Sequence, residues 1–292
     1  MSLAMTDIRI DFNVDDTPES LAAMLDRLGL SWSESAPIRV DLADYEYLGP
    51  AAVVVLCCLL ASRSIAGAQT DLVPPKLPKL LAYCEFSGLM NRFLGDPTPD
   101  ASHPKNETLA VTEFSAFDMR LLGAVTGLVR RHIDIGAGAE EALKTSLSEM
   151  MYNVVDHADS PVGGLLSARA FNDVREVRVV IADIGVGVLA TLRRTMPNLG
   201  SHRDALQEAM KGNRSARSTS RNLGQGLTNI DSIVRRNGGQ LMLASYDSVY
   251  IRRGETVRIK HLRHPFPGTL ACIRFRVDNA LYDEDIEDND VW

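Results

Sequence analysis

Apolar and polar residues before residue 95 follow two periods, one typical of strands and the other of helices. Residues 8–12, 38–42 and 69–73 are predicted strands, and the first two alternate strictly, as half-buried strands do. The predicted helices cover residues 17–28 and 51–66 and, as a last helix, residues 80–84 with 89–94. Strands and helices repeated at this spacing predict a small α/β layer.

The predicted helix 51–66 is apolar on every side as far as Ser62. A helix with this pattern is buried between neighbouring elements, whereas a surface helix keeps one polar face. Its strongly apolar run, residues 51–61, is too short to cross a bilayer, because a membrane-spanning helix takes about 20 residues. We therefore expect a core helix and no role in a membrane.

A stretch rich in proline, glycine and small polar residues, 95–105, divides the chain into two halves. After it, residues 140–158 predict a helix, 177–183 an apolar strand, 202–211 a helix, and residues up to 236 an amphipathic helix. The expected organisation is a first domain at 6–95, a linker at 96–107, a second domain at 108–278 and an acidic tail at 279–292. The fold class expected is α/β, with an α/β layer followed by an α/β sandwich.

Composition and charge narrow the class of partner. The 292 residues are 45% hydrophobic and carry a net charge of −7, which argues against a broad electrostatic surface for nucleic acid or anionic membrane. The four cysteines form no disulfide framework and no signal-peptide pattern opens the chain, so we expect a reducing cytoplasm. Part of the charge lies in the tail, which is typical of a solvated segment, with a docking role as the alternative.

The first candidate chemistry lies on the predicted helix 140–158. Glu149, Asn153 and His157 are spaced four residues apart, so they lie along one side of that helix. An amide oxygen is a ligand for a hard cation such as Mg²⁺, and a carboxylate one turn away can act as a general base. The alternative is a stripe of polar residues that faces solvent.

The second group follows the apolar strand 177–183. Asp183 can accept a hydrogen bond from an exocyclic amine such as that of adenine, and Gly185 and Gly187 let the backbone approach a flat base. The alternative is a dinucleotide fingerprint, which Gly185, Gly187 and Ala190 also satisfy. That fingerprint requires an acid at the end of the next strand, about 20 residues on, where 202–211 predicts a helix.

The third group is Gly224, Gly226 and Leu227, directly ahead of a predicted helix. Backbone N–H groups at a helix start, together with the helix dipole, favour a phosphate. An ordinary helix-capping turn is the alternative. The Walker-type phosphate loop is absent from the sequence, so a phosphate site here is of another kind.

Taken together, Glu149 with Asn153, Asp183 with Gly185 and Gly187, and Gly224 with Gly226 resemble the motifs of the GHKL ATPases. These are gyrase, the Hsp90 chaperones, histidine kinases and MutL. The resemblance covers residues 108–278, and 148–158 is most similar to the anti-sigma-factor serine kinases. Pro267, Gly268 and Thr269 are similar to the motif that closes the family's domain.

The resemblance implies a fold and a set of roles. The fold would be an α/β sandwich with helices on one face of a mixed sheet and ATP between the two layers. Asn153 would ligate Mg²⁺, Glu149 would be the general base, and Asp183 would bind the adenine amino group. The remaining nucleotide-binding residues would be Gly185 and Gly187 at the base, Gly224 and Gly226 at the phosphates, Leu227 and Thr269.

A lid over the nucleotide is implied as well. It would be mobile and would cover residues 188–222. Its basic residues are Lys211, Arg214, Arg217 and Arg221. They would add positive charge near a triphosphate, although each of them also suits an ordinary solvated loop.

The first half resembles a STAS domain, the fold of bacterial anti-sigma-factor antagonists, over residues 6–95. Residues 40–48 and 76–81 carry this resemblance, and a generic α/β domain is the alternative. Phosphorylated antagonists have an aspartate and a serine where a helix opens, but here Gly49, Pro50, Ala51 and Ala52 offer no hydroxyl. We therefore expect a docking or dimerising surface and no phosphoryl acceptor, and a homodimer is compatible with this.

The function expected is a Mg·ATP-dependent ATPase or serine/threonine kinase that acts on a regulatory protein partner, such as a sigma factor or a STAS antagonist. The alternative is a module in which ATP sets a conformation that holds or releases that partner. His132 lacks the acidic, proline-flanked setting of a phosphoacceptor histidine, which argues against a complete sensor kinase.

Overall fold

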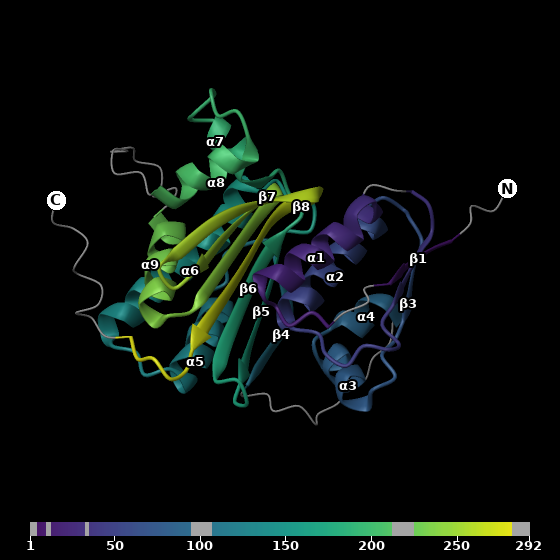
Figure 1. The fold of residues 1–292 in the computed structure, drawn as a ribbon, viewed down its shortest axis with the longest axis horizontal. Helices are drawn as coiled ribbons and strands as arrows, with labels where there is room; N and C mark the ends of the chain where they lie inside the picture. The colour runs from purple at the N-terminus through teal and green to yellow at the C-terminus, as the bar shows by residue number, and fades with distance from the viewer. Residues whose placement is uncertain (1–4, 10–12, 33–34, 95–106, 212–224, 282–292) are drawn as a thin grey trace.

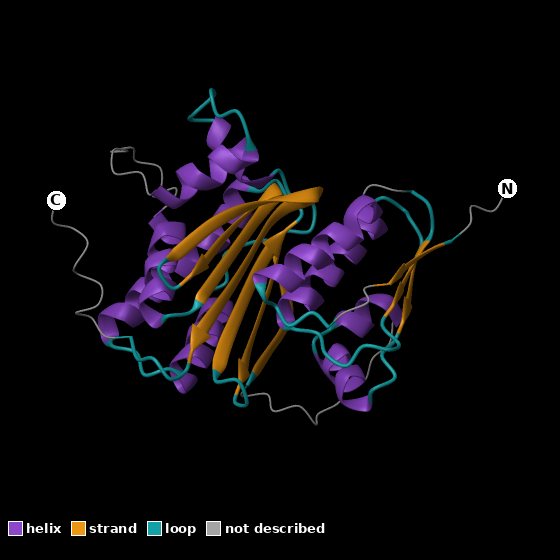
Figure 2. Ribbon diagram, in the orientation of Figure 1, coloured by secondary structure: helices purple, strands orange, loops and turns teal. Residues whose placement is uncertain are grey.

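The computed structural model describes residues 5–9, 13–32, 35–94, 107–211 and 225–281. The chain is a mixed α/β protein with one parallel and one antiparallel sheet, which confirms the expected fold class (Figures 1 and 2). The first half contains β1 (Thr6–Arg9), α1 (Pro18–Leu28), the 3₁₀ helix η1 (Gly29–Trp32), β2 (Ile38–Asp41), α2 (Pro50–Ile65), β3 (Thr70–Val73), α3 (Pro78–Phe86) and α4 (Leu89–Leu94).

The second half contains the larger sheet and its helices. Its elements are β4 (Thr108–Phe114), α5 (Met119–His132), α6 (Ala137–His157), β5 (Gly164–Phe171), β6 (Glu176–Asp183), α7 (Gly187–Arg193), α8 (His202–Lys211), α9 (Gln225–Asn237), β7 (Gln240–Arg253) and β8 (Thr256–Arg276). No helix among the described residues is long and apolar enough to cross a membrane.

Most of the predicted elements are present, and the last helix of the first half is the exception. The predicted strands 38–42 and 69–73 and the helices starting near residues 17 and 51 are confirmed as β2, β3, α1 and α2. Strand β1 overlaps the first predicted strand, 8–12, at residues 8 and 9, and residues 10–12 lie outside the described residues. The predicted last helix is two helices, α3 and α4, because the chain turns at Ser87 and at Gly88, whose φ is +84°. The stretch 95–105 lies outside the described residues, as does the predicted linker 96–107 except for Glu107.

The two sheets enclose the helices of the first half. Strands β1, β2 and β3 form a parallel sheet in that order, and Figure 2 shows α1 and α2 between it and the larger sheet. The outward face of the parallel sheet is charged, since Arg39 on β2 lies 3.7 Å from Asp7 and 3.9 Å from Asp71. Helix α2 is buried along nearly its whole length, which explains its apolar sequence.

The larger sheet has the order β4-β5-β6-β8-β7 and is antiparallel at each of these pairings. The mixed sheet implied by the family resemblance is therefore wrong for this chain. Helices α1 and α2 contact one face of this sheet, and α5, α6 and α9 cover the other (Figure 1). Residues of β6 alternate between the two sides: Val180 and Ala182 join the core with α2, whereas Val179 and Ile181 join the core with α6.

The β7–β8 hairpin bends back on itself. Tyr246 has a φ of +51°, and the β7–β8 register shifts on both sides of it. The backbone N–H of Gly254, in the hairpin turn, consequently donates to the carbonyl of Gly239, just before β7, at 3.4 Å. The tip of the hairpin thus lies beside the end of α9.

A buried polar group joins the two halves. Asp16 is 1% exposed with a φ of +60°, and its carboxylate accepts from the backbone N–H of Ala52, in the first turn of α2, at 3.2 Å. Gly49 is required here, because a Cβ at that position would lie 2.2 Å from this carboxylate. Arg178 on β6 lies 3.6 Å from the other Asp16 oxygen and donates to the Tyr47 hydroxyl at 3.0 Å.

Candidate functional site

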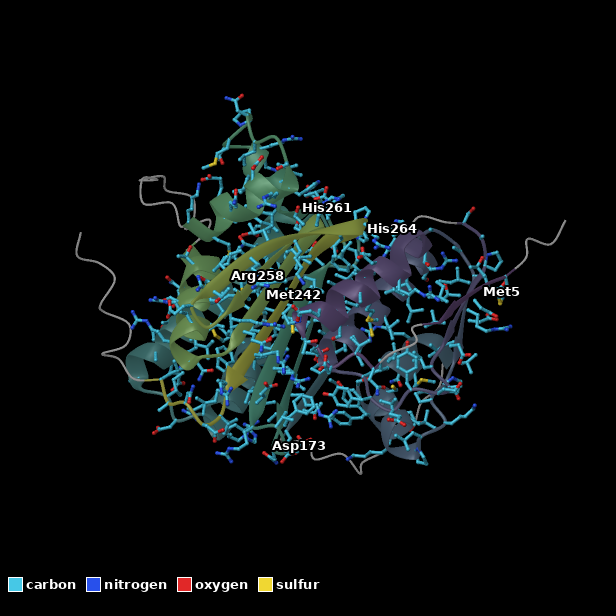
Figure 3. The ribbon with its side chains drawn as sticks, in the orientation of Figure 1. Met5, Asp173, Met242, Arg258, His261 and His264 are labelled. Carbon is cyan, nitrogen blue, oxygen red and sulfur yellow. The ribbon has the colours of Figure 1, made fainter. Side chains whose placement is uncertain are left out.

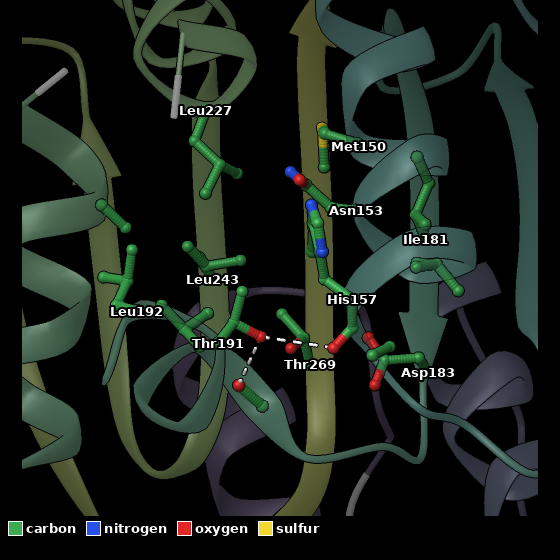
Figure 4. Close-up of a pocket in the computed structure, with 16 residues that line it drawn as sticks. Met150, Asn153, His157, Ile181, Asp183, Thr191, Leu192, Leu227, Leu243 and Thr269 are labelled. Carbon is green, nitrogen blue, oxygen red and sulfur yellow. Dashed lines mark hydrogen bonds between the residues drawn. The ribbon is translucent and has the colours of Figure 1, made fainter. Parts of the chain in front are cut away.

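A pocket opens between the larger sheet and the helices on the side away from the first half. It encloses about 760 Å³ of empty space, a volume that includes solvent at its open mouth. Its lining comes from α6, α7, α8, α9 and the strands β6, β7 and β8 (Figure 4). The lining residues are Met150, Asn153, Val154, His157, Ala158, Ile181, Asp183, Gly187, Val188, Thr191, Leu192, Ala209, Leu227, Leu243, Thr269 and Ala271.

The structure brings together most of the residues singled out from the sequence. Five of them line the pocket: Asn153, Asp183, Gly187, Leu227 and Thr269. Three others, Glu149, Gly185 and Gly226, lie in the same elements or the adjoining loop but are not part of the lining. Gly224 lies outside the described residues.

Asp183 is the buried anionic group of this pocket. It ends β6, is 3% exposed and pairs in register with Thr269 of β8. Burial raises the pKa of Asp183 to about 6, although hydrogen bonds from the backbone N–H of Gly185 and from Thr269 oppose the shift. The Gly185 bond measures 2.8 Å. Because the rest of the lining is mostly apolar, this carboxylate is a fixed acceptor for a donor on a ligand.

The two glycines after Asp183 are needed because the backbone passes close to other elements. A Cβ on Gly185 would lie 1.9 Å from the carbonyl oxygen of Ala158, at the end of α6. That carbonyl also accepts from the backbone N–H of Val186 at 2.7 Å. Gly187 has a φ of +71°, and a Cβ there would lie 2.8 Å from the Ser245 hydroxyl. Both glycines therefore allow the loop to close tightly against α6 and β7.

Asn153 and His157 project from α6 into the pocket (Figure 4). Both are partly buried, as is Glu149 one turn earlier. Leu147 and Met151 of the same helix are fully buried in the core. These three residues are therefore partly shielded from solvent, on the side of α6 that carries the pocket and the contact with α9.

Glu149 faces the start of α9. A Cβ on Gly226 would lie 2.8 Å from Oε2 of Glu149, so only glycine allows α9 to approach this closely. Burial raises the pKa of Glu149, and a hydrogen bond from the backbone N–H of Gly226 opposes the shift. Oε2 is buried and has no hydrogen-bond partner among the described residues. A carboxylate in this state holds a proton more readily than one in water.

The described part of the segment predicted as a lid consists of two helices joined by residues 194–201. Residues 188–211 contribute α8 and almost all of α7, and α7 is tied to its surroundings by two short contacts. The backbone N–H of Val188 donates to the Ser245 hydroxyl of β7 at 3.0 Å. The Thr191 hydroxyl donates to the carbonyl of His157, at the end of α6, at 3.4 Å (Figure 4). At the start of α8, His202 stacks on Tyr246 with 4.6 Å between ring centroids.

The basic residues predicted for the lid are only partly visible. Lys211 ends α8, is exposed and forms an ion pair with Glu208 at 2.5 Å. Arg214, Arg217 and Arg221 lie outside the described residues. The positive charge expected from these arginines near a triphosphate therefore stays a prediction.

Several lining residues were not predicted from the sequence. Val188, Thr191 and Leu192 come from α7, whose short length leaves too little periodicity to recognise a helix. Ala209 comes from α8, whose helix was predicted but not its position over the pocket. Leu243 comes from β7, and the sequence contains no signal that places this strand beside α6.

The side chains of the described residues show which kind of metal ion the pocket could bind. No group of three or more His, Cys, Asp or Glu side chains among the described residues could hold a metal ion. Mg²⁺ does not require such a group, because it is commonly bound through one or two protein oxygens together with substrate phosphates and water. The side-chain oxygen of Asn153 fits that mode.

The comparisons with known proteins add no assignment. No family model matches the sequence, and a search of curated proteins finds no relative.

Proposed function

We propose that this chain binds Mg·ATP in the pocket between α6 and the larger sheet and acts on a regulatory protein partner. The observation that carries the proposal is the buried carboxylate of Asp183 at the end of a mostly apolar pocket, with Asn153 on the facing helix. An apolar slot with one fixed acceptor suits a flat base that bears an exocyclic amine, as adenine does. The GHKL resemblance of the same residues supports this choice.

The positions of Asn153 and Glu149 support a nucleotide whose phosphates extend toward α9. Asn153 lies one turn from Glu149 on α6, and the backbone N–H of Gly226, at the start of α9, donates to Glu149. Asn153 would hold Mg²⁺, which neutralises phosphate charge when it is bound. Glu149 would accept a proton from the attacking water or hydroxyl, and its raised pKa suits a general base.

Two outcomes of ATP binding fit this site. One is chemical: hydrolysis of ATP or phosphoryl transfer to a serine or threonine of the partner, as in the anti-sigma-factor kinases. The other is a switch without transfer, in which ATP sets a conformation that holds or releases the partner. The buried contact between the first half and the nucleotide-binding sheet favours the second, because a change in the sheet would reach both.

Isothermal titration calorimetry with and without Mg²⁺ tests the site. Asn153→Ala should weaken Mg·ATP binding far more than binding of metal-free ATP, because it removes a metal ligand and leaves the base pocket intact. Asp156→Ala is the matched control, since Asp156 is an exposed residue of the same helix. Equal Mg·ATP affinities for Asn153→Ala and the control would contradict the role of Asn153 as a ligand of Mg²⁺.

Turnover separates the two outcomes of binding. Glu149→Ala should bind Mg·ATP nearly normally but lose turnover by about 10²- to 10⁴-fold, the usual effect of removing a general base. Radiolabelled γ-phosphate followed into water and into candidate partners then distinguishes hydrolysis from transfer. Wild-type protein that binds Mg·ATP but gives neither product with any partner would support the switch without transfer.

A further inference from the structure

The bent β7–β8 hairpin leaves a strand at the margin of the larger sheet. Residues 256–261 of β8 pair with residues 248–253 of β7. Within the described part of the chain, this portion of β8 pairs with no other strand, so the backbone N–H and C=O groups of its outer side have no strand partner. At its far end, the N–H of Arg263 donates to Asp26 of α1 at 2.6 Å. We call residues 256–263 the basic edge strand. Such an edge can accept a further strand by backbone hydrogen bonding.

Positive charge is concentrated on this edge. Arg258, His261 and Arg263 are exposed, and Lys260 is partly exposed between them. Lys260 is paired with Glu19 of α1 at 3.4 Å, but no carboxylate of the described chain pairs with the side chain of Arg258 or Arg263. Figure 3 shows Arg258 and His261 on the β7–β8 hairpin that forms this margin.

The charge restricts what can pair with the edge. A second copy of the same strand would bring arginine and lysine against arginine and lysine, which opposes edge-to-edge association. An acidic extended segment would meet the opposite charge over the same length. The complement of this edge is therefore acidic.

The chain itself contains one strongly acidic run. Six carboxylates occur among the eleven residues that follow Leu281, namely Asp283, Glu284, Asp285, Glu287, Asp288 and Asp290. No basic residue interrupts them. We call residues 282–292 the acidic segment.

The last described residues before the acidic segment lie close to the hairpin turn. Asn279 exchanges hydrogen bonds with Asn237 at the end of α9, at 2.8 and 2.7 Å. Two residues further along, the carbonyl of Gly239 accepts from Gly254 in the hairpin turn. Asn279 and the start of the basic edge strand therefore contact the same short turn. Two residues after Asn279, Leu281 exchanges backbone hydrogen bonds with Asp134 and Gly136, and the acidic segment begins there.

The lengths also agree. Eleven extended residues span at most about 36 Å, and the eight residues of the basic edge strand span about 26 Å. We propose that the acidic segment docks along the basic edge strand of its own chain, where it adds a strand to the sheet and neutralises Arg258 and Arg263.

Hydrogen exchange measured by mass spectrometry tests the docking in the full chain. Backbone amides of residues 256–263 should exchange about tenfold more slowly in the full chain than in a chain that ends at Leu281, because an added strand protects edge amides. The difference should shrink at high salt, since the contact is electrostatic and exposed. Equal exchange in the two chains at low salt would overturn the proposal.

Charge variants provide the controls. Arg258→Glu combined with Arg263→Glu should lose the protection, whereas Arg120→Glu should keep it, because Arg120 is 95% exposed on α5 and far along the chain from the edge. Replacing the six carboxylates by their amides should act like truncation. Protection that appears only as protein concentration rises would assign the edge to the acidic segment of a second copy and contradict docking within one chain.

Discussion

The two faces of the larger sheet belong to the same strands but have different surroundings. Toward α6 and α9, the sheet leaves a pocket with Asp183 and Asn153 in its lining. Toward α1 and α2, the apolar side chains of both halves merge in one continuous core. Each face has a deeply buried aspartate with a raised pKa, Asp183 on the open face and Asp16 on the filled one.

The difference between these aspartates lies in their partners. Asp16 caps α2 and lies beside the guanidinium of Arg178, so its charge is matched within the protein. Asp183 accepts hydrogen bonds from Gly185 and Thr269, and no cation among the described residues forms an ion pair with it. A buried carboxylate without a counter-charge is unfavourable in the folded chain, and a ligand donor would relieve that cost. The comparison therefore distinguishes Asp16, whose charge is compensated inside the protein, from Asp183, for which we propose a donor on a ligand.

The largest effect is expected from breaking the matched pair. Arg178→Met leaves Asp16 buried without its counter-charge and removes the hydrogen bond to Tyr47, so the free energy of unfolding should fall by about 3–5 kcal/mol. Urea denaturation measures this change in the free energy of unfolding. Arg39→Met is the matched control, because its ion pairs with Asp7 and Asp71 lie on the exposed sheet face and should contribute less than about 1 kcal/mol. Equal losses in the two variants would contradict the comparison.

A smaller effect should appear in the pH dependence. The pKa of Asp183 is about 6 in the folded chain, against an ordinary value of 3.8. The folded state therefore holds this proton more tightly than the unfolded state, and the resulting stability is present below pH 3.8 and lost as pH rises through 6. The loss for one fully buried group is up to about 3 kcal/mol.

Asp183→Asn removes that titration. Relative to wild type, the variant should gain free energy of unfolding between pH 4.5 and pH 7.5, because only the wild type loses stability as its carboxylate ionises. Asp173→Asn, in the exposed turn between β5 and β6, controls for a general change of charge. Parallel pH profiles for wild type and Asp183→Asn would contradict the raised pKa of Asp183.

The smallest effect concerns the loop that follows Asp183. Gly185→Ala places a methyl group against the carbonyl of Ala158, which should destabilise the fold by about 1–3 kcal/mol and weaken nucleotide binding. Gly123→Ala is the control: it lies within α5 with no atom within 4 Å of the new methyl group, so it should stabilise by about 0.5–1 kcal/mol. Unchanged ATP affinity in Gly185→Ala would show that this loop does not contribute to nucleotide binding.

Local periodicity predicted much of the fold. The alternation in β2 and the four-residue spacing on α6 come from backbone geometry alone, so they could be read without tertiary information. The all-round apolar sequence of α2 also predicted a buried position, and it lies between the two sheets. For the site, the spacing of Glu149 and Asn153 predicted one side of α6: Asn153 lines the pocket, and Glu149 faces the start of α9.

Other features depend on distant contacts and could not be predicted. Asp16 and Tyr246 are not glycines, yet both have positive φ values, and each is held by partners far along the chain. The antiparallel pairing of β6 with β8 joins residues about 90 apart, which no local pattern encodes. The position of the first half against one face of the larger sheet is likewise a property of the packed core.

Binding of Mg·ATP to wild type and to Asp183→Asn tests the central claim most directly. Calorimetric titration at pH 7.5 should show binding to wild type and a loss of affinity of about 10- to 150-fold in the variant, the effect of removing a hydrogen bond to a charged acceptor. Circular dichroism should show the same fold for both proteins. Equal affinities, or no binding of Mg·ATP to the wild-type chain, would contradict the assignment of this pocket to a nucleotide.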